Sequence, residues 1–484
     1  MNLKSLVKDT ALYGLSSIVG RFLSYLLVPL HTLKIASESG GYGIVSNLYA
    51  HTALLLAILT FGMETTLFRF SNKQGEDAGK VYGTTLKMVG GVALLFLAGV
   101  LVFLGPISVA LGYEAHPEYV GMMASVVAMD AFQAIMFSRL RQQGKALKFV
   151  ILKFAYIIPD VLLNLVIFLV LPKLFATCPR LEALYIRENY GVGLIFAANL
   201  LCTTCVFFGF GSELGGLRTK FDFPLAKRML GYTWPLLILS IMGMLNQSAD
   251  KILFPRLVAG PEGNVQLGIY SAAAKLAMIM TILTQAFRYA YEPIVFNSSR
   301  DKDNPETLAD GMKFYVLSAM FAWAAIIVYL PVLKYIIGPG YWEGLKVIPI
   351  VMMAEIFMGV YFNLSFWYKL TDRTWWGAVM SGAGAVVMIA LNIWGVPRFG
   401  YMACAWGGFA GYGVSMVLSF ILGRKYYPVR YDASAMALFT AMALATAGIY
   451  SLLGGICIPV RIAAGTVLLA LYALMYLKEL KKQH

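Results

Sequence analysis

The chain consists largely of apolar runs that are each long enough to cross a bilayer. A transmembrane helix needs about 20 mostly apolar residues, and the sequence contains fourteen such runs separated by short polar segments. Of the 484 residues, 59% are hydrophobic and only 13% are charged, whereas about a quarter of the residues in a soluble domain are charged. The runs therefore predict an all-α polytopic membrane protein.

The expected spans cover most of the chain and have an even number, so both termini lie on one side of the membrane. Their approximate ranges are 8–30, 43–65, 86–112, 119–138, 149–172, 190–211, 229–250, 268–295, 312–334, 346–368, 374–395, 400–422, 433–453 and 457–478. Lys and Arg gather at the N-terminus and in every second loop, as cytoplasmic loops do. Both termini are therefore expected in the cytoplasm. The loops also account for the net charge of +14, so nucleic-acid binding is not expected.

Landmark residues recur along the chain at an offset of 225–226 positions. The matched landmarks are Pro29 with Pro255, residues 43–46 with 268–271, Pro106 with Pro331, Gly112 with Gly338, Asp130 with Glu355, Phe132 with Phe357, and Pro172 with Pro397. The offset predicts two parallel six-helix repeats, an N-lobe at 1–225 and a C-lobe at 226–428, followed by a helix pair at 429–484. Parallel repeats with a site near the bilayer midplane are typical of secondary transporters.

Several charged residues are expected inside the membrane, where a charge costs at least about 2.5–3.5 kcal/mol. Such a side chain must face a cavity or another protein group, or reach the interface from a helix end. In the first half these polar positions are Ser17, Arg21, Ser24 and Tyr25 in span one, Asp130 in span four, and Lys153, Tyr156, Asp160 and Asn164 in span five. In the second half they are Asn246, Gln247 and Asp250 in span seven, Lys275, Gln285 and Arg288 in span eight, and Glu355 in span ten.

These positions predict a central cavity that carries cations and a few carboxylates. Buried cations suit an anionic ligand, and the guanidinium fork of Arg can bind phosphate through two hydrogen bonds. The expected substrate-binding residues are Arg21, Ser17, Ser24, Tyr25, Lys153, Lys275, Gln285 and Arg288. The residues expected to couple transport to H⁺ or Na⁺ are Asp130, Asp160, Asp250, Glu355 and Asn246. No other cofactor and no resident metal is expected.

Seven segments carry a resemblance to a known family through their order and spacing. They are 41–46 (GYGIVS), 61–70 (FGMETTLFRF), 138–144 (SRLRQQG), 231–239 followed by Asp250, 268–277 (GIYSAAAKLA), 286–293 (AFRYAYEP) and 392–400 (NIWGVPRFG). Over roughly residues 10–425 the chain resembles the polysaccharide (O-antigen, Wzx-like) flippase family of the multidrug/oligosaccharidyl-lipid/polysaccharide (MOP) exporter superfamily.

The resemblance implies that an undecaprenyl-diphosphate-linked oligosaccharide is moved from the cytoplasmic to the periplasmic leaflet by alternating access, for cell-surface polysaccharide biosynthesis. Arg21 and Lys275 match positions where the family carries cations in its lumen. The expected partners are the lipid-linked oligosaccharide, the bilayer, and a polysaccharide polymerase or glycosyltransferases, and we expect a monomer.

Other functions remain open alternatives. Spans thirteen and fourteen resemble the extra helix pair of lipid II flippases, but span eleven offers Ser381 and Asn392 without the carboxylate of their sodium site. A multidrug antiporter would favour an acidic, aromatic cavity over one with Arg21 and Lys275. An enzyme is not expected, because the only metal-nucleotide-like pattern is the D-x-D at 301–303 in an acidic loop. No nucleotide-binding motif is present to drive flipping with ATP.

Overall fold

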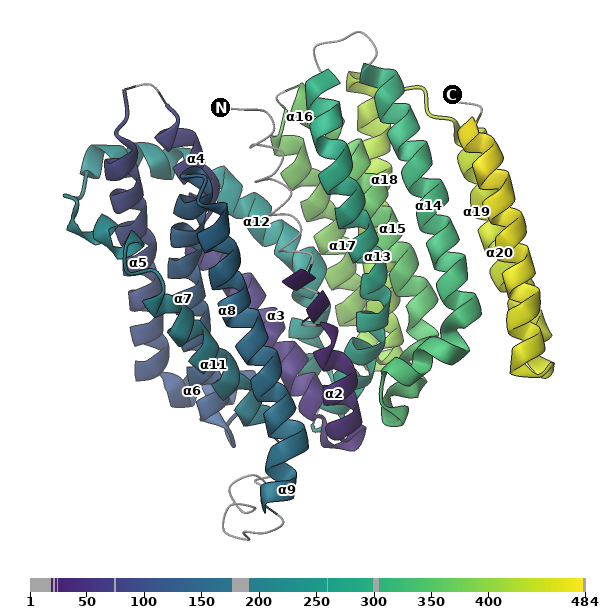
Figure 1. The fold of residues 1–484 in the computed structure, drawn as a ribbon, viewed down its shortest axis with the longest axis horizontal. Coiled ribbons are helices and arrows are strands. Elements are labelled where there is room, and N and C mark those ends of the chain that lie inside the picture. The colour runs from purple at the N-terminus through teal and green to yellow at the C-terminus, as the bar shows by residue number, and fades with distance from the viewer. Residues whose placement is uncertain are drawn as a thin grey trace. The chain divides into compact units, whose positions relative to one another are not determined.

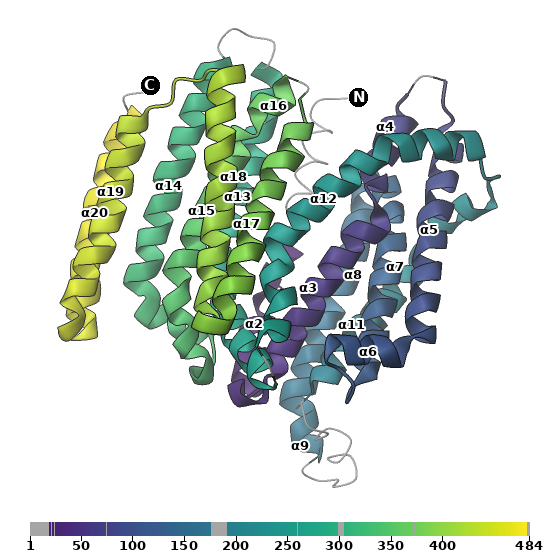
Figure 2. The ribbon, with the colours of Figure 1, turned by 180° about the vertical axis from the view of Figure 1, so that it is seen from behind.

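The computed structural model describes residues 19–481 apart from 21, 24, 74, 176–190, 259, 299–303 and 372. The described residues form helices joined by short connections, with no β-strand among them. The chain divides into two compact units, Met1–Gly268 and Ile269–His484 (Figures 1 and 2). Within the described part, twelve helices are long and apolar enough to cross a membrane. The chain is therefore a multi-pass membrane protein.

The structure confirms the predicted all-α membrane fold. The predicted number of fourteen transmembrane spans is approximate. Twelve of the predicted spans overlap the twelve long helices, most of them to within several residues, whereas the predicted span 86–112 lies later in the chain than the helix Ala78–Val102. The predicted span 190–211 is the shorter apolar helix Val192–Phe208, and the predicted span 8–30 falls largely outside the described residues. The lobe boundaries after residues 225 and 428 rest on the sequence repeat and stay a prediction.

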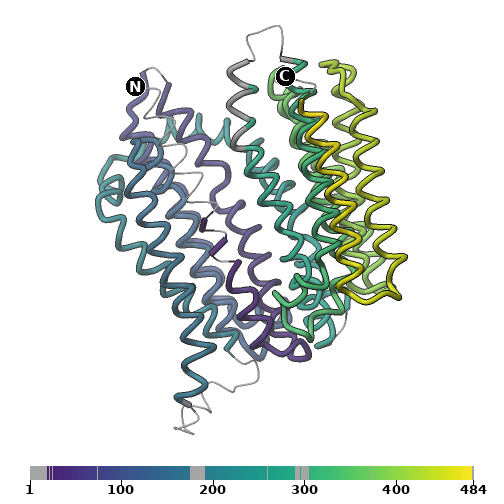
Figure 3. Tube along the Cα trace, turned by 45° about the vertical axis from the view of Figure 1, so that its right-hand side comes forward, coloured from purple at the N-terminus to yellow at the C-terminus, as the bar shows by residue number. Residues whose placement is uncertain are grey.

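The first unit is organised around one central helix, α7. Its helices are α2 Leu27–Lys34, α3 Gly41–Thr60, α4 Met63–Ser71, α5 Ala78–Val102, α6 Leu104–Leu111, α7 Pro117–Gln142, α8 Ala146–Leu165, α9 Leu171–Phe175, α11 Val192–Phe208 and α12 Phe223–Leu257, with the short helices η1 Ser37–Ser39, η2 Val166–Val170 and η3 Glu213–Arg218. Helix α7 packs against α3, α5 and α11, and α12 packs along α3 (Figure 3). Leu86, Val127, Ile135 and Met229 are fully buried where these helices meet.

Aspartates mark the start of three long helices. Asp77 accepts a hydrogen bond from the Gly79 amide at the start of α5, and Asp222 accepts one from the Leu225 amide at the start of α12. Asp432 accepts one from the Ala435 amide at the start of α19, Ala433–Leu452. An N-cap carboxylate satisfies an amide that the first helical turn leaves unpaired. Each aspartate directly precedes the first residue of its helix, so the hydrogen bond marks where the helix begins.

The span Gly41–Ser71 is interrupted between α3 and α4, whereas the sequence predicted one uninterrupted span over 43–65. Phe61 has φ 32° and Gly62 has φ 72°, a left-handed conformation that a bulky residue rarely adopts. Thr233 Oγ1 of α12 donates a 2.6 Å hydrogen bond to the Phe61 carbonyl. A Cβ atom on Gly62 would lie 2.9 Å from Leu236 Cβ. Close packing of α12 therefore holds the break in place.

The second unit contains the remaining long helices. They are α13 Glu262–Ser298, which begins before the unit boundary, α14 Asn304–Leu333, α15 Ile348–Leu364, α16 Phe366–Leu370, α17 Trp375–Phe399, α18 Met402–Tyr426, α19 Ala433–Leu452 and α20 Ile458–Lys481, with the short helices η4 Lys334–Ile336, η5 Pro339–Val347 and η6 Leu453–Gly455. Small residues let α17 and α18 approach closely. A Cβ atom on Gly384 would lie 2.5 Å from the Gly411 carbonyl oxygen, and Ser415 Oγ donates to the Met380 carbonyl across the same seam.

The C-terminal helix pair α19 and α20 is fastened to α14 by polar contacts. Lys313 Nζ of α14 donates to Asp432 Oδ2 at 2.8 Å and to Glu479 Oε1 at 2.6 Å. Three further contacts continue along α14: Tyr472 to the Leu317 carbonyl, Ser318 with Tyr476, and Tyr329 with Thr466. Lys313 is only 8% exposed. We refer to Lys313, Asp432 and Glu479 as the C-terminal clamp.

Candidate functional site

The predicted polar stripe of span five lies along α8. Lys153, Tyr156 and Asp160 are half-buried, and Asn164 is buried. Asn164 Nδ2 donates to the Asp160 carbonyl at 2.8 Å, and Asn164 Oδ1 lies 2.8 Å from His31 Nε2 on α2. The π-helix η2 follows Asn164 within two residues, and single π-helical turns are frequent at functional sites. The sequence did not single out His31, because its partner is 133 residues away.

Lys153 has neighbours that could hold its charge within the first unit. Asp130 on α7 is near enough to influence the charge of Lys153 electrostatically, so these two predicted residues lie in the same part of the first unit. Lys153 Nζ also lies 4.3 Å from the centre of the Phe137 ring, a favourable position for a cation. Mutual charge stabilisation between α7 and α8 and a transport role both fit this arrangement.

Three predicted residues of span one, Ser17, Arg21 and Ser24, lie outside the described residues. Tyr25, the fourth member of that face, is half-buried. Their expected contact with the substrate stays a prediction.

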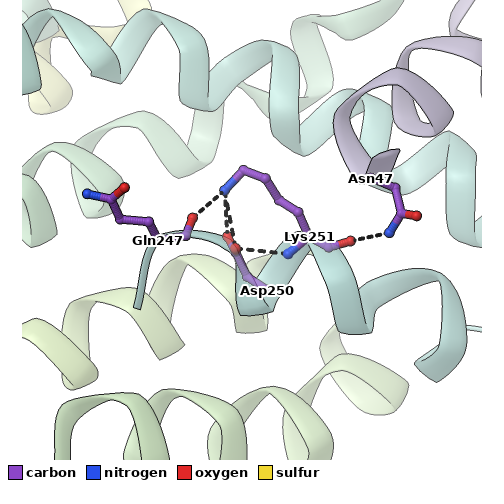
Figure 4. Close-up of polar contacts among 4 residues, drawn as sticks. All are labelled: Asn47, Gln247, Asp250 and Lys251. Atoms are coloured by element: carbon purple, nitrogen blue, oxygen red, sulfur yellow. Dashed lines mark hydrogen bonds and ion pairs between the residues drawn. The ribbon is translucent and has the colours of Figure 1, made fainter. Parts of the chain in front are cut away.

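Asp250 lies in a polar junction between α12 and α3 (Figure 4). Lys251 Nζ is 3.1 Å from Asp250 Oδ2 and 3.3 Å from the Gln247 carbonyl. Asn47 Nδ2 of α3 donates to the Lys251 carbonyl at 2.6 Å, and the Tyr113 hydroxyl donates to Asn47 Oδ1 at 2.7 Å. Asp250 is therefore paired with a cation beside a helix junction. That pairing gives it a structural role in addition to the ion coupling predicted for it.

One turn before this junction, Asn246 donates through Nδ2 to the Met242 carbonyl at 3.3 Å. This contact lies within α12. Its predicted part in ion coupling stays a prediction.

The predicted residues of the second unit come mainly from α13. Lys275 and Gln285 are half-buried, whereas Arg288 is exposed and its guanidinium carbon lies 4.3 Å from the centre of the Phe362 ring. Glu355 of α15 accepts a 2.8 Å hydrogen bond from Thr281 Oγ1 of α13. The structure thus joins Glu355 to the helix that carries the predicted cations.

A polar pocket in the first unit was not predicted from the sequence. It has a volume of about 350 Å³ and lies among α4, the end of α7 and α12. Its charged residues are Glu64 and Arg141, whose Oε2 and Nη2 atoms are 3.0 Å apart. Ser138 Oγ lies 3.1 Å from the same Glu64 oxygen. The segments 61–70 and 138–144, which carry the family resemblance, therefore meet here, and their separation of about 75 residues hid the contact.

The family model described as polysaccharide biosynthesis protein matches residues 6–294. No curated protein matches the chain in sequence.

Among solved structures, the lipid II flippase MurJ in an inward closed conformation has a TM-score of 0.73 at 14% identity, covering 97% of this chain and 99% of that one. An inward-facing multidrug resistance MATE family transporter of the MOP superfamily has a TM-score of 0.65 at 14% identity, covering 83% and 93%. A MOP superfamily transporter from Pyrococcus furiosus, whose binding pocket is described as having reverse polarity, has a TM-score of 0.58 at 13% identity, covering 86% and 95%. With the MOP transporter fold and the family match over more than half of its length, the chain belongs to the polysaccharide biosynthesis protein family.

Proposed function

We propose that this protein is a flippase that moves an undecaprenyl-diphosphate-linked oligosaccharide from the cytoplasmic to the periplasmic leaflet of a bacterial inner membrane. The observation that carries the proposal is the family match over residues 6–294 on a chain with the MOP transporter fold. The family supports a polysaccharide pathway, and the fold supports translocation rather than catalysis. Both termini face the cytoplasm in this proposal, as the positive-inside pattern favours.

The charged residues within the membrane spans would supply the binding chemistry. Arg21 and Lys275 would attract the diphosphate, because cations suit an anionic group. Asp130, Asp160 and Glu355 would exchange H⁺ or Na⁺ as the two sides open in turn. In the predicted repeat Asp130 matches Glu355, whereas Arg21, Asp160 and Lys275 have no charged counterpart, and such asymmetry suits a transporter that moves its substrate in one direction.

Deletion of the gene tests the proposed function directly. We expect a lipid-linked capsule or O-antigen intermediate to accumulate on the cytoplasmic leaflet, identified by mass spectrometry of extracted lipids. Re-expression of the intact chain should clear it. Unchanged lipid-linked glycans after deletion would contradict the flippase proposal.

Replacement of the cavity cations tests the proposed binding chemistry. Because each cation is expected to contact the diphosphate through charge-assisted hydrogen bonds worth about 1.5–3 kcal/mol, Arg21→Ala or Lys275→Ala should slow export by about tenfold or more. Export is measured as periplasmic glycan per unit of protein in the membrane. The control is Lys346→Ala, which removes an exposed cation paired with Glu343. If Arg21→Ala and Lys275→Ala both export normally, the anion-binding cavity is wrong.

A lipid II flippase is the second candidate, favoured by one observation. The match to MurJ covers 97% of this chain, whereas the match to the MATE transporter covers 83%. The deletion experiment separates the two candidates, because a lipid II flippase would leave lipid II itself on the cytoplasmic leaflet.

A further inference from the structure

The pocket beside the break between α3 and α4 combines polar groups of several kinds around one aromatic ring. Its lining includes Thr60, Glu64, Thr65, Phe68, Arg141 and Ser240. The volume of about 350 Å³ falls within the range of about 300–1,000 Å³ found for small-molecule sites. The pocket is thus large enough for one compact polar ligand.

The charged pair of the pocket leaves hydrogen-bonding capacity to spare. Arg141 uses Nη2 for both of its hydrogen bonds, to Glu64 Oε2 and to Ser138 Oγ. A guanidinium carries five donor hydrogens and a carboxylate has about four acceptor positions. Donors and acceptors therefore stand side by side at this pair.

The total charge of the residues that line the pocket indicates which class of ligand it can bind. Glu64 and Arg141 neutralise each other at 3.0 Å, and the other lining residues that we name are uncharged. A carboxylate at the wall repels a diphosphate. A neutral ligand that both donates and accepts hydrogen bonds meets no such penalty.

The aromatic ring of Phe68 restricts the class of suitable ligands further. Phe68 lines the pocket, and the Arg141 guanidinium carbon lies 5.4 Å from the centre of its ring. The negative face of an aromatic ring attracts the weakly positive C–H edge of a ligand. A sugar ring offers C–H groups on its face and hydroxyls, which both donate and accept, around its edge.

The backbone of the break supports a binding role. Phe61 adopts a left-handed conformation immediately before α4, and strained residues of this kind cluster at ligand sites. The break ends α3 and starts α4 at Met63, one residue before Glu64. An uninterrupted helix would place Glu64 and Thr65 differently relative to Ser240 of α12.

We propose that the pocket lined by Glu64, Phe68 and Arg141 binds a sugar ring of the translocated glycan. The inference rests on the proposed flippase function and adds to it a subsite for the neutral part of the substrate. The diphosphate is then bound at a different place in the protein.

Binding of free sugars to the purified full-length protein tests the inference. The probes are the methyl glycosides of glucose, galactose, mannose and N-acetylglucosamine, with inorganic pyrophosphate as the anionic probe, and binding is followed by saturation-transfer NMR in nanodiscs. We expect at least one glycoside to bind, and Glu64→Gln or Arg141→Gln to weaken it by about tenfold or more, since each removes a charge-assisted hydrogen bond. Pyrophosphate binding should be unchanged in these variants.

Two further variants keep the test decisive. Phe68→Leu retains an apolar side chain but removes the ring, and it should weaken glycoside binding even if the variants of the charged pair do not fold. Glu76→Gln breaks the comparable Glu76–Arg228 pair outside the pocket and should bind sugar as the wild type does.

Several outcomes would overturn the inference. One is that no glycoside binds. Another is that Glu64→Gln and Phe68→Leu leave glycoside binding unchanged. The third is that pyrophosphate binding is lost in those variants. The gene deletion tests the flippase proposal independently of the sugar pocket. If deletion blocks export while Glu64→Gln and Phe68→Leu export at the wild-type rate, the sugar pocket is wrong and the flippase stands.

Discussion

Replacement of Lys313 by methionine should destabilise the second unit more than any replacement of an exposed lysine. Lys313 Nζ contacts both Asp432 and Glu479, and its side chain is only 10% exposed. The variant leaves two carboxylates facing each other without a cation. Removal of one partner from a buried ion pair costs about 3–5 kcal/mol, and we expect the lower end because the Asp432 side chain is 40% exposed. Thermal unfolding of the purified protein measures the loss.

A matched lysine provides the control for the C-terminal clamp. Lys346 pairs with Glu343 at 3.1 Å, but the two side chains are 51% and 64% exposed. An exposed pair of this kind contributes about 0–1 kcal/mol, so Lys346→Met should unfold almost as the wild type does. The triple variant Lys313→Met, Asp432→Asn, Glu479→Gln should recover much of the lost stability. Equal melting temperatures for Lys313→Met and Lys346→Met would show that the clamp does not hold the helix pair.

The pH dependence of the clamp follows from Asp432, which lies between two membrane spans. The hydrogen bond from Lys313, followed by those from the Ala435 amide and the Ser434 hydroxyl, lowers the pKa of Asp432 from 3.8 to about 2. A carboxyl group with a lowered pKa in the folded state stabilises the fold at higher pH. This contribution is lost as the pH falls from about 3.8 to about 2. In Asp432→Asn, stability should be lower at neutral pH and should change less across that window.

The spans could be predicted from sequence because a bilayer imposes a length on every helix that crosses it. Helix α17, for example, was predicted at 374–395 and runs over Trp375–Phe399. The stripe from Lys153 to Asn164 could also be predicted, because residues at helical spacing share a face. Both inferences depend only on residues that are near one another in the chain.

The features missed by sequence reasoning depend on partners that are distant in the chain. Lys313 lies at the start of the predicted span 312–334, where a lysine is common. Its partners Asp432 and Glu479 lie 119 and 166 residues away. The break at Phe61 has no proline to indicate it, and it is held by Thr233, which is 172 residues away. Glu64 finds Arg141 only after α7 has packed against α4. Tertiary packing decided each of these features, so no local pattern could indicate them.

Joint replacement of Asp130 and Lys153 should separate a transport role from a structural one. Lys153→Met alone leaves Asp130 as a charge within a membrane span, which costs at least about 2.5–3.5 kcal/mol if it stays ionised. We therefore expect less of this variant in the membrane. The double variant Asp130→Asn, Lys153→Met removes both charges, so neither side chain remains as an uncompensated charge within a span. Its amount in the membrane should return to the wild-type level.

Export by the double variant then decides the role of the pair. If Asp130 exchanges an ion during transport, the double variant should be as abundant as the wild type but export at least about tenfold less glycan, a difference of about 1.4 kcal/mol or more. The matched control is Glu76→Gln with Arg228→Met, which removes a pair whose arginine side chain is 50% exposed and should change neither amount nor export. If the Asp130 and Lys153 double variant recovers both its amount and its export, the pair only joins α7 to α8. The coupling group would then have to be sought among Asp160, Asp250 and Glu355.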